Sequence, residues 1–471
     1  MAKKAYLGID GVAHKVKKGY IGIPTESSEQ VGTAVLRTMY SKDGTACSQQ
    51  PIWDDASQQY QPQGTTAAIS ASAIWYTLWS KDPSLRYAIL DSAPNSYAAL
   101  SENGFGETTG LMYSRTGKAR KIKKAYLGIG GVARPCWSGG ELTYYGQLST
   151  PLSAARARLA ATTVGNYALF GGGYASSTRS NVDPYNASLV RQTTIALRVA
   201  ASSLAATTVG NYALFGGGLD NSDDELDTVT AFSASLTKTS VTSLTSAVYS
   251  PAAATIGNYA LFCGGRALST DFSSVSAYDA SLTKKSSVTK LSYSKSMLAA
   301  TTVGNYALFG GGTRDGSSTS GTSSIDAYSA SLTRTTLNAM HGGGYYLAAT
   351  TVGNYALFTG GKTTQYNLNS KTDAYDASLT NTIATSLSAG KYELTAATVG
   401  EYALFAGGYD GDDAYQSVDA FDASLTKTMP TSLSSPKRRL AATTIGNYAL
   451  FAGGVNRGSG TYDTVEAYTI V

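Results

Sequence analysis

The chain has 471 residues, of which 50 are glycine and 33 are tyrosine, and only 15% of the residues are charged. A hydrophobic share of 42% is enough for large packed cores, so general disorder is excluded. Two histidines and three cysteines argue against a His-rich metal enzyme and against a disulfide framework. No run approaches the ~18 apolar residues of a membrane span, and the first residues lack the apolar core of a signal peptide. We therefore expect a soluble chain without membrane insertion.

The N-terminal region contains a short repeat of its own. The segment Lys3–Val16 returns as Lys123–Arg134, and both contain the phrase Lys-Ala-Tyr-Leu-Gly-Ile. Alternating residues around a Gly-containing pair predict β-hairpins with two-residue turns. Alignment of the copies predicts a hairpin module from residues 1–23 and 117–140. Residues 24–116 are then a domain inserted at a hairpin tip, where insertions are best tolerated.

Positive charge concentrates in this hairpin module. Residues 1–23 carry five Lys and one Asp, or +4, and residues 115–134 carry seven Lys or Arg and no acid, or +7. Because the whole chain is +5, the remaining residues sum to −6. Contact with nucleic acid or a membrane surface is one interpretation. We favour the other, in which Lys keeps the exposed hairpin edges from pairing.

The inserted domain differs in composition from the rest and is expected to be mixed α/β. It holds Trp53, Trp75 and Trp79, three of the four tryptophans. Apolar residues at helical spacing predict a helix over 66–81, and Asp82-Pro83 ends it. We interpret its aromatic stripe as core packing rather than a ligand platform, and we assign this domain no chemistry.

Seven copies of one phrase occupy the last 70% of the chain. The clearest copy is Leu159–Gly173, Leu-Ala-Ala-Thr-Thr-Val-Gly-Asn-Tyr-Ala-Leu-Phe-Gly-Gly-Gly. Its tyrosine recurs at spacings of 45, 47, 47, 49, 47 and 46 residues, within the range of propeller blades. The seven tyrosines are Tyr167, Tyr212, Tyr259, Tyr306, Tyr355, Tyr402 and Tyr448.

Each copy predicts four strands. Leu159–Val164 has the small and β-branched residues of a buried inner strand, and Tyr167–Phe170 follows a Gly-Asn turn. Val418–Phe421 illustrates the third strand, and a Thr-rich run such as Thr426–Ser434 contains the fourth. One such sheet cannot bury both faces, so seven sheets must stack around an axis. The fold class predicted for residues 141–471 is an all-β, seven-bladed β-propeller.

These repeats resemble the kelch family. The resemblance is carried by the paired glycines that end the second strand, the aromatic residue before Asp in the third, and the period near 47. It implies a seven-bladed propeller. The chain departs from the family in one respect, because kelch blades carry a Trp in strand four and residues 141–471 contain none.

The ends of the repeat region predict how the ring closes. The seventh copy stops after its third strand, at Val465–Val471. A fourth strand precedes every other copy, and residues 141–150 precede the first one in the same way. We therefore expect residues 141–150 to complete the last blade, since an open sheet edge would otherwise be exposed.

Antiparallel connectivity separates the loops onto two faces. Turns after strands one and three, on the invariant face, repeat the same residues; loops after strands two and four, on the variable face, differ in every copy. We interpret the variable face as a binding surface, because loops on rigid scaffolds carry function and Tyr supplies contact area at low entropic cost. Drift of unconstrained loops is the alternative. The candidate ligand-binding residues are Tyr174, Arg179, Asp220, Asp223, Asp224, Tyr249, Arg266, Tyr293, Arg314, Asp315, His341, Tyr345, Gln365, Tyr366, Tyr392, Tyr409, Asp410, Tyr415, Asn456, Arg457 and Tyr462.

The sequence predicts no catalytic residues, no metal and no cofactor. His14 and His341 are too far apart in sequence to suggest a shared site, and kelch-fold copper oxidases need a His-rich one. Cys47, Cys136 and Cys263 fall in three different modules and are expected to be unpaired thiols. The acidic loops that begin at Asp220 and Asp410 leave Ca²⁺ binding as an alternative, although neither follows a known loop pattern.

The N-terminal hairpins carry a second resemblance. Lys-Lys-x-Tyr-x-Gly hairpins ending in Gly-Val-Ala-Arg-Pro-x-Trp resemble N-terminal segments of tail proteins from phages and prophages of Gram-positive bacteria. The resemblance implies a non-enzymatic virion protein that attaches to other tail or baseplate proteins through its stem, with a homo-oligomer such as a trimer as one option. Its expected partner is a host cell-surface receptor, a glycan; nucleic acid is not expected. A cellular kelch scaffold and a glycan-acting enzyme are the alternatives.

Overall fold

The computed structural model describes residues 141–314, 320–364 and 366–470 in full, and in residues 1–140 the backbone of the strands. The chain divides into two compact units, Met1–Gly140 and Glu141–Val471. Each unit is described by itself.

The first unit contains a four-stranded antiparallel sheet built from its two ends. The strands are β1 (Lys4–Ile9), β2 (Val12–Val16), β13 (Lys124–Ile129) and β14 (Val132–Ser138), in the order β14-β13-β1-β2. The pairs Ile9↔Val12 and Ile129↔Val132 each enclose two residues. The repeated segments therefore pair with each other through β1 and β13. A stem function and the boundaries of the inserted domain stay predictions.

Only strands are described between these ends. They are β3 (Met39–Tyr40), β4 (Ala46–Cys47), β5 (Pro51–Asp54), β6 (Gln59–Pro62), β7 (Tyr76–Leu78), β8 (Arg86–Ile89), β9 (Tyr97–Ser101), β10 (Gly104–Glu107), β11 (Met112–Ser114) and β12 (Ala119–Lys121). The helix predicted over 66–81 is wrong at Tyr76–Leu78, which is strand β7 paired with β8. Aromatic and β-branched residues favour a strand once a partner is present, which helical spacing cannot reveal. The other residues of that prediction lie outside the described part.

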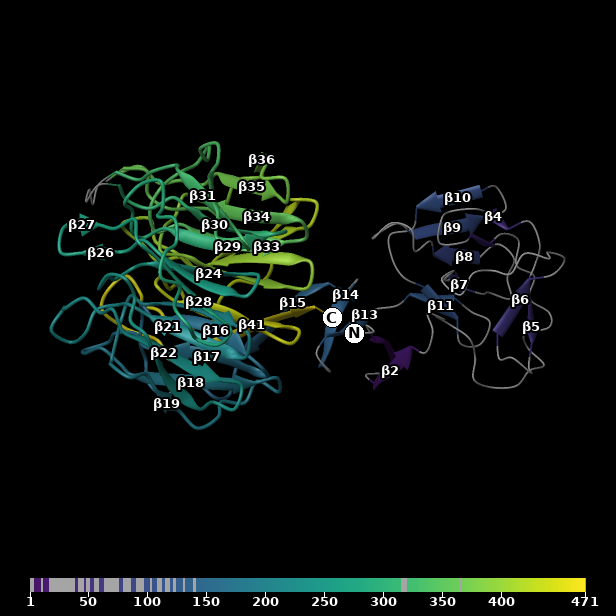
Figure 1. Ribbon diagram of the computed structural model, residues 1–471, viewed down its shortest axis with the longest axis horizontal. Coiled ribbons are helices and arrows are strands. Elements are labelled where there is room, and N and C mark those ends of the chain that lie inside the picture. The colour runs from purple at the N-terminus through teal and green to yellow at the C-terminus, as the bar shows by residue number, and fades with distance from the viewer. Residues whose placement is uncertain are drawn as a thin grey trace. The chain divides into compact units, whose positions relative to one another are not determined.

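The second unit is a ring of seven blades, each an antiparallel sheet (Figure 1). The innermost strands are β16 (Ala160–Val164), β20 (Ala205–Val209), β24 (Ala252–Ile256), β29 (Ala299–Val303), β33 (Ala348–Val352), β37 (Thr395–Val399) and β41 (Ala441–Ile445). The second strands are β17 (Tyr167–Gly171), β21 (Tyr212–Gly216), β25 (Tyr259–Cys263), β30 (Tyr306–Gly310), β34 (Tyr355–Thr359), β38 (Tyr402–Ala406) and β42 (Tyr448–Ala452). The third strands are β18 (Asn181–Asn186), β22 (Val229–Ser233), β28 (Val275–Asp279), β31 (Ile325–Ser329), β35 (Thr372–Asp376), β39 (Val418–Asp422) and β43 (Val465–Ile470). The fourth strands are β19 (Ile195–Ala196), β23 (Lys238–Val241), β32 (Arg334–Thr336), β36 (Asn381–Ala384), β40 (Lys427–Thr428) and β15 (Leu142–Gln147).

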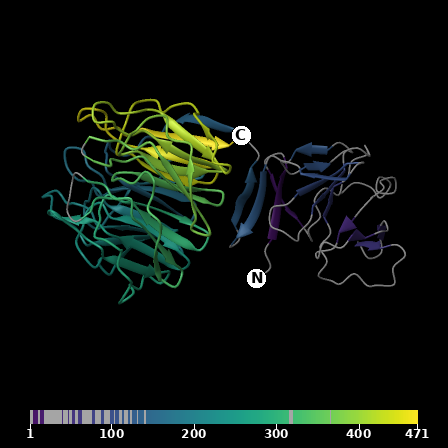
Figure 2. The same ribbon diagram turned by 90° about the horizontal axis from the view of Figure 1, so that it is seen from above.

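The innermost strands close the ring. Each contacts the first strand of the next blade, and β41 of the last blade contacts β16 of the first. Thr163 Oγ1 donates to the carbonyl oxygen of Thr444 at 2.6 Å, across that closing contact. Figure 2 shows the same ring from a second side, with strands β41, β42 and β43 of the last blade in yellow. The predicted seven-bladed propeller is confirmed.

The last blade takes its fourth strand from the start of the repeat region. Strand β15 pairs antiparallel with β43, with Leu142 opposite Ile470, so the sheet order is β15-β43-β42-β41. The Tyr144 hydroxyl donates to Glu466 Oε2 at 2.7 Å across this pair. The prediction that residues 141–150 contain the closing strand is confirmed.

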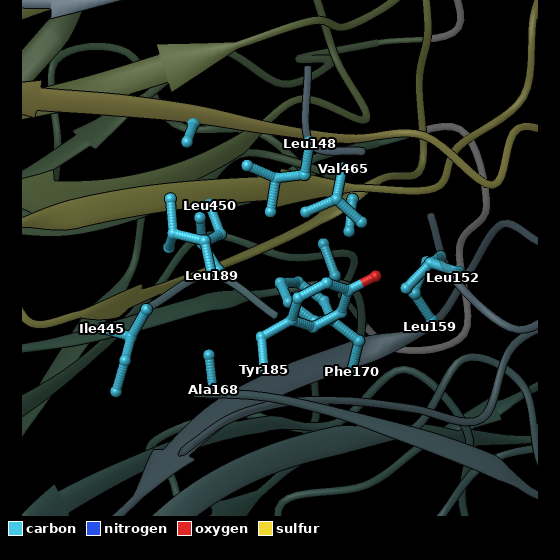
Figure 3. Close-up of a cluster of buried hydrophobic side chains, with 13 residues drawn as sticks. Leu148, Leu152, Leu159, Ala168, Phe170, Tyr185, Leu189, Ile445, Leu450 and Val465 are labelled. Carbon is cyan, nitrogen blue, oxygen red and sulfur yellow. The ribbon is translucent and has the colours of Figure 1, made fainter. Parts of the chain in front are cut away.

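Seven hydrophobic cores hold the blades together, each between two adjacent blades. The core in Figure 3 lies where the ring closes: Phe170 and Tyr185 come from the first blade, and Leu450 and Val465 from the last. Burial of these side chains contributes about 25 cal/mol per Å² of apolar surface. A blade alone would leave half of each core in water, so the blades stabilise one another.

An aromatic pair joins the second and third strands of every blade. In every blade a Phe of strand two meets a Tyr or Phe of strand three edge to face, as in Phe451–Tyr468, with ring centroids 5.6 Å apart. The Tyr468 hydroxyl also donates to the carbonyl oxygen of Thr431 at 2.7 Å, in the loop that enters the blade. The other pairs are Phe170–Tyr185, Phe215–Phe232, Phe262–Tyr278, Phe309–Tyr328, Phe358–Tyr375 and Phe405–Phe421.

One blade differs from the prediction of four strands. The third blade is the three-stranded sheet β24-β25-β28, and only an isolated bridge, Tyr278↔Lys284, follows its third strand. The segment Lys284-Lys-Ser-Ser287 lacks the Thr, Ile and Val found there in other blades. The same blade carries an extra hairpin, β26 (Arg266–Ala267) and β27 (Thr270–Asp271), in the loop after strand two.

Candidate functional site

The invariant face repeats its residues because they pack against each other. A Cβ added to Gly165, whose φ is +55°, would lie 2.9 Å from the Cβ of Ala234 in the next blade. Ala234 lies in the turn that follows strand three of the second blade. In the equivalent turn of the third blade, Asp279 Oδ1 accepts hydrogen bonds from the N–H groups of Ser281 and Thr283. Repetition on this face therefore has a structural cause.

The variable face is organised by three residues that enter each blade just before strand one. In the first blade this lead-in segment is Arg156-Ala157-Arg158. Its first carbonyl accepts a hydrogen bond of 2.9 Å from the N–H of Gly454 in the last blade. The preceding Gly453 must be glycine, because its φ is +69° and a Cβ there would lie 2.5 Å from that same carbonyl oxygen. The glycine pairs thus hold the lead-in segments in place.

The third residues of the lead-in segments form a closed ring of backbone hydrogen bonds around the propeller axis, which we name the axial ring. Each N–H donates to the carbonyl oxygen of its counterpart in the preceding blade, at 2.8–3.1 Å, and the N–H of Arg158 returns to Arg439. The axial ring consists of Arg158, Ser203, Ser250, Met297, Tyr346, Glu393 and Arg439.

All seven axial-ring residues have left-handed backbone conformations, with φ between 49° and 58°, although none is glycine. Such a conformation costs an L-residue roughly 1–2 kcal/mol. It persists only where the surroundings impose it, and such positions cluster at functional sites. The ring of hydrogen bonds is the surrounding structure that imposes it here.

The middle residues of the lead-in segments form a second ring around the first. Each pairs through its backbone with the residue that follows the glycine pair of the same blade, as Tyr249 does with Arg266 and Tyr392 with Tyr409. Of the sequence-predicted residues, Tyr249, Tyr345 and Tyr392 belong to this second ring, and Tyr174, Arg266 and Tyr409 are the backbone partners of Ala157, Tyr249 and Tyr392.

The structure brings three of the predicted tyrosines together with one that the sequence did not single out. Tyr346 lies between Tyr345 and Tyr392, with ring centroids 5.6 Å and 6.3 Å away, and Tyr392 lies 5.6 Å from Tyr409. The ammonium of Lys362 lies 4.4 Å from the ring centroid of Tyr392. These four aromatic side chains form a continuous series, in which Tyr345 and Tyr392 are buried and Tyr346 and Tyr409 are partly exposed.

Charged groups gather beside this series. Glu393 Oε1 binds Arg439 at 2.6 Å, and its Oε2 binds Arg438 at 2.8 Å. The Arg438 guanidinium also stacks on Tyr409 at 4.0 Å. Burial, together with the negative charge of Glu393, raises the pKa of Tyr346 to about 12. The phenol therefore stays protonated and can donate a hydrogen bond.

Other predicted residues form separate pairs farther out. Arg314 stacks on Tyr293 with its guanidinium carbon 4.0 Å from the ring centroid. Arg457 binds Asp413 at 3.2 Å with both side chains exposed. Tyr174 and Tyr366 are exposed, Tyr366 to 84%. The variable face thus also carries separate side-chain pairs and single exposed tyrosines that do not belong to the series of four tyrosines.

The acidic loops use carboxylates to fold their own backbone. Asp220 Oδ1 accepts from the N–H groups of Ser222 and Asp224, and Asp410 Oδ1 accepts from those of Asp412 and Asp413. Within the described residues there is no group of three His, Cys, Asp or Glu placed to hold a metal ion.

The remaining predicted residues lie in several positions. Asp223 and Asp224 are exposed, whereas Arg179 is partly buried. Asn456 Oδ1 accepts from Gly460, Tyr415 donates to Asp410, and Tyr462 lies 4.9 Å from the ammonium of Lys437. Asp315 and Gln365 lie outside the described residues. Cys263 is a buried free thiol.

Buried ion pairs support the lead-in segments, and sequence reasoning missed them. Arg156 Nη2 binds Asp183 Oδ2 at 2.8 Å, and both side chains are fully buried. The same carboxylate accepts from the N–H of Ser153, which fixes the loop entering the blade. Equivalent pairs in other blades are Lys295–Asp326, Lys391–Asp419 and Lys437–Glu466. The sequence contains a pattern that could have predicted these pairs: wherever the first lead-in residue is a cation, strand three of the same copy contains an acid.

His341, a predicted ligand residue, takes over this supporting role in the fifth blade. That blade has Gly344 where others have the buried cation, yet it keeps the acid Asp373. His341 Nδ1 lies 2.9 Å from Asp373 Oδ1, and the N–H groups of His341 and Gly342 also donate to the carboxylate. His341 therefore supports the loop, and its predicted role in ligand binding stays a prediction.

Comparison with known proteins does not extend this description. No known protein family matches the chain, and no curated protein matches it. Within the part of the chain that is described, no helix has the length and apolar character needed to cross a membrane.

Proposed function

We propose that this protein binds a cell-surface receptor through the variable face of its propeller, as a recognition component of a phage tail or tail-like particle. The observation that carries the proposal is the contrast between the two faces. The residues of the invariant face are repeated because they pack together, whereas the axial ring and its tyrosines vary within one fixed backbone.

A rigid ring that presents different side chains at equivalent positions is suited to recognition. Tyr and Arg are enriched at the energetic centres of interfaces. The series Tyr345, Tyr346, Tyr392 and Tyr409 places four aromatic rings side by side, and Arg438 stacks on the last one. Aromatic faces next to hydrogen-bonding groups suit saccharides, so the proposed receptor is a surface glycan.

The resemblance of the N-terminal hairpins to phage tail proteins supplies the setting. The propeller's first strand, β15, follows directly on the hairpin unit in sequence. In the proposal the hairpins attach the protein to the tail and the propeller contacts the cell. The kelch-like repeats by themselves fit a scaffold protein equally, and the hairpins favour the tail protein.

A glycan-acting enzyme receives less support. Glycosidases usually need two carboxylates about 5–9 Å apart. In the axial ring Glu393 is the only carboxylate, and it is engaged by Arg438 and Arg439. Catalysis by a tyrosine nucleophile would need a lowered pKa, and the pKa of Tyr346 is raised to about 12.

Binding of the labelled full-length chain to intact cells of a panel of Gram-positive bacteria tests the proposal. One variant replaces the exposed apolar residues Tyr174, Leu268 and Tyr366 of the variable face by Ser. The matched control replaces Val190, Ile383 and Met429, which are exposed elsewhere on the blades. We expect the first variant to lose binding and the control to keep it. Equal binding by both variants would refute a role of these outer loops of the variable face in cell binding.

A further inference from the structure

The axial ring is asymmetric in charge. Arg158 and Arg439 occupy adjacent positions, linked by the hydrogen bond from the N–H of Arg158, and both have φ of 56°. Ser203, Ser250 and Met297 fill the positions that follow Arg158 around the ring. The positive charge therefore lies on one side of the axis, and uncharged side chains lie on the other.

The positive side carries more charge than its own carboxylate can neutralise. Glu393 binds both Arg438 and Arg439, so a single negative charge faces three guanidinium groups. Within the described residues, the guanidinium of Arg158 has no ion pair and no side-chain hydrogen bond, and the residue is exposed to solvent. Partial desolvation and the neighbouring charge of Arg439 both lower the pKa of Arg158.

We propose that Arg158 and Arg439, together with Tyr346, bind the anionic group of a charged saccharide at the propeller axis. The inference rests on the proposed function and names the substrate class of that face. A guanidinium matches the two oxygens of a carboxylate or phosphate with paired N–H donors. The protonated hydroxyl of Tyr346 supplies a further donor beside them.

The rest of the saccharide is accommodated by the neighbouring side chains. The partly exposed Tyr346 ring offers an apolar face to the sugar ring, and the buried Tyr392 ring, 6.3 Å away, supports it. Ser203 and Ser250, on the uncharged side of the axial ring, offer hydroxyl groups to sugar hydroxyls. The fixed left-handed backbone holds these groups in place before the ligand arrives, which lowers the entropic cost of binding.

The test measures binding of sodium glucuronate, glucose 6-phosphate and glucose to the full-length chain by ligand-observed NMR titration. We expect one or both anionic sugars to bind and glucose not to bind. Arg158→Gln should weaken anion binding about tenfold or more, since a charge-assisted hydrogen bond is worth roughly 1.5–3 kcal/mol. Arg158→Lys keeps the charge without the planar fork, so it should bind with intermediate affinity.

Arg457→Gln is the matched control, because it removes an exposed Arg of the same face away from the axis. It should leave anion binding unchanged, and unaltered melting temperatures would show that both variants fold. Binding of glucuronate alone assigns the site to carboxylates, and binding of the phosphate alone assigns it to phosphorylated sugars. Equal affinity for glucose, or full affinity in Arg158→Gln, would overturn the inference.

Failure of this inference is distinguishable from failure of the proposed function. Loss of cell binding in the Tyr174, Leu268 and Tyr366 variant, with unchanged anion affinity in Arg158→Gln, would reject only the axial site. Anion binding that depends on Arg158, together with cell binding unaffected by that triple variant, would reject only the receptor role of the outer loops.

Discussion

The backbone N–H of Arg158 donates a hydrogen bond of 2.9 Å to the carbonyl oxygen of Arg439, and this bond joins the first blade to the last at the axial ring. The two residues are 281 positions apart in sequence and adjacent around the axis. Closure of the propeller therefore also places the two arginines of the ring side by side. The proposed anion site therefore depends on closure of the whole ring.

Removal of the closing strand should destabilise the propeller strongly. Deletion of residues 1–150 exposes the edge of β43 and removes Leu148 from the core between the first and last blades. We expect a fall in melting temperature of the order of 10 °C. The deletion should remove several kcal/mol of unfolding free energy, and each kcal/mol lowers the melting temperature by roughly 2–4 °C. Deletion of residues 1–140, which keeps β15, is the control and should melt near the full-length chain. Identical melting of the two deletions would contradict closure by β15.

The chain's own repeats provide a test of the buried ion pairs. Lys295 and Asp326 are both fully buried in the fourth blade. The equivalent positions of the third blade hold the neutral residues Val248 and Ser276. Lys295→Val should lower the free energy of unfolding by about 3–5 kcal/mol, because it leaves a buried carboxylate unpaired.

The double variant Lys295→Val with Asp326→Ser should recover most of this loss, since it copies the neutral arrangement of the third blade. Chemical denaturation measures both variants. A double variant as unstable as the single one would show that the desolvated charge is not the cause.

Stability should depend on pH through Asp183. Burial alone would raise the pKa of Asp183, but the charge of Arg156 and hydrogen bonds from Thr194, Arg156 and Ser153 outweigh burial and hold it below 3.8. A lowered pKa in the folded state contributes stability above the unfolded value, and this contribution is lost as pH falls through the folded value. We therefore expect the difference in unfolding free energy between wild type and Asp183→Asn to be constant above pH 3.8 and to shrink below it. Parallel stability curves down to acid pH would contradict this assignment.

The left-handed conformation of the axial ring should be sensitive to side-chain branching. Met297 has a φ of 55°, which a β-branched residue tolerates poorly. Met297→Ile should be less stable than Met297→Leu by about 1 kcal/mol, although both replacements are apolar and similar in volume. Urea unfolding of the two variants measures the difference. Equal stability would mean that the ring relaxes at this position.

Sequence periodicity predicted the blades because it reports local structure. The inner strand Ala160–Val164 and the second strand Tyr167–Gly171 begin and end within one residue of the predicted bounds. The closing strand was also predictable, since a copy that lacks its fourth strand implies a donor elsewhere in the chain. The helix predicted over 66–81 failed at Tyr76–Leu78, where pairing with β8 outweighed the helical spacing of apolar residues.

The candidate site was predictable only in part. The tyrosines of the variable loops were identified, and the structure gathers Tyr345, Tyr392 and Tyr409 near the axis. Tyr346, Arg158 and Glu393 were not identified. Their backbone is left-handed, but the sequence has no Gly or Asn at these positions that would indicate such a conformation. The contact of His341 with Asp373, which gives it a structural role as well, was not predicted.

The sequence by itself determined the architecture: the number of blades, the strands in six of them, the closing strand and the division into a repeated and a variable face. These properties follow from the alternation of residues along strands, the turn residues between strands and the repeat length, all of which can be read from the sequence of the copies. The tertiary structure decided which variable residues meet. Ring closure brings Arg158 beside Arg439, and hydrogen bonds between blades impose a left-handed backbone on seven unlike residues. Both depend on contacts between distant copies, so no single repeat contains the information.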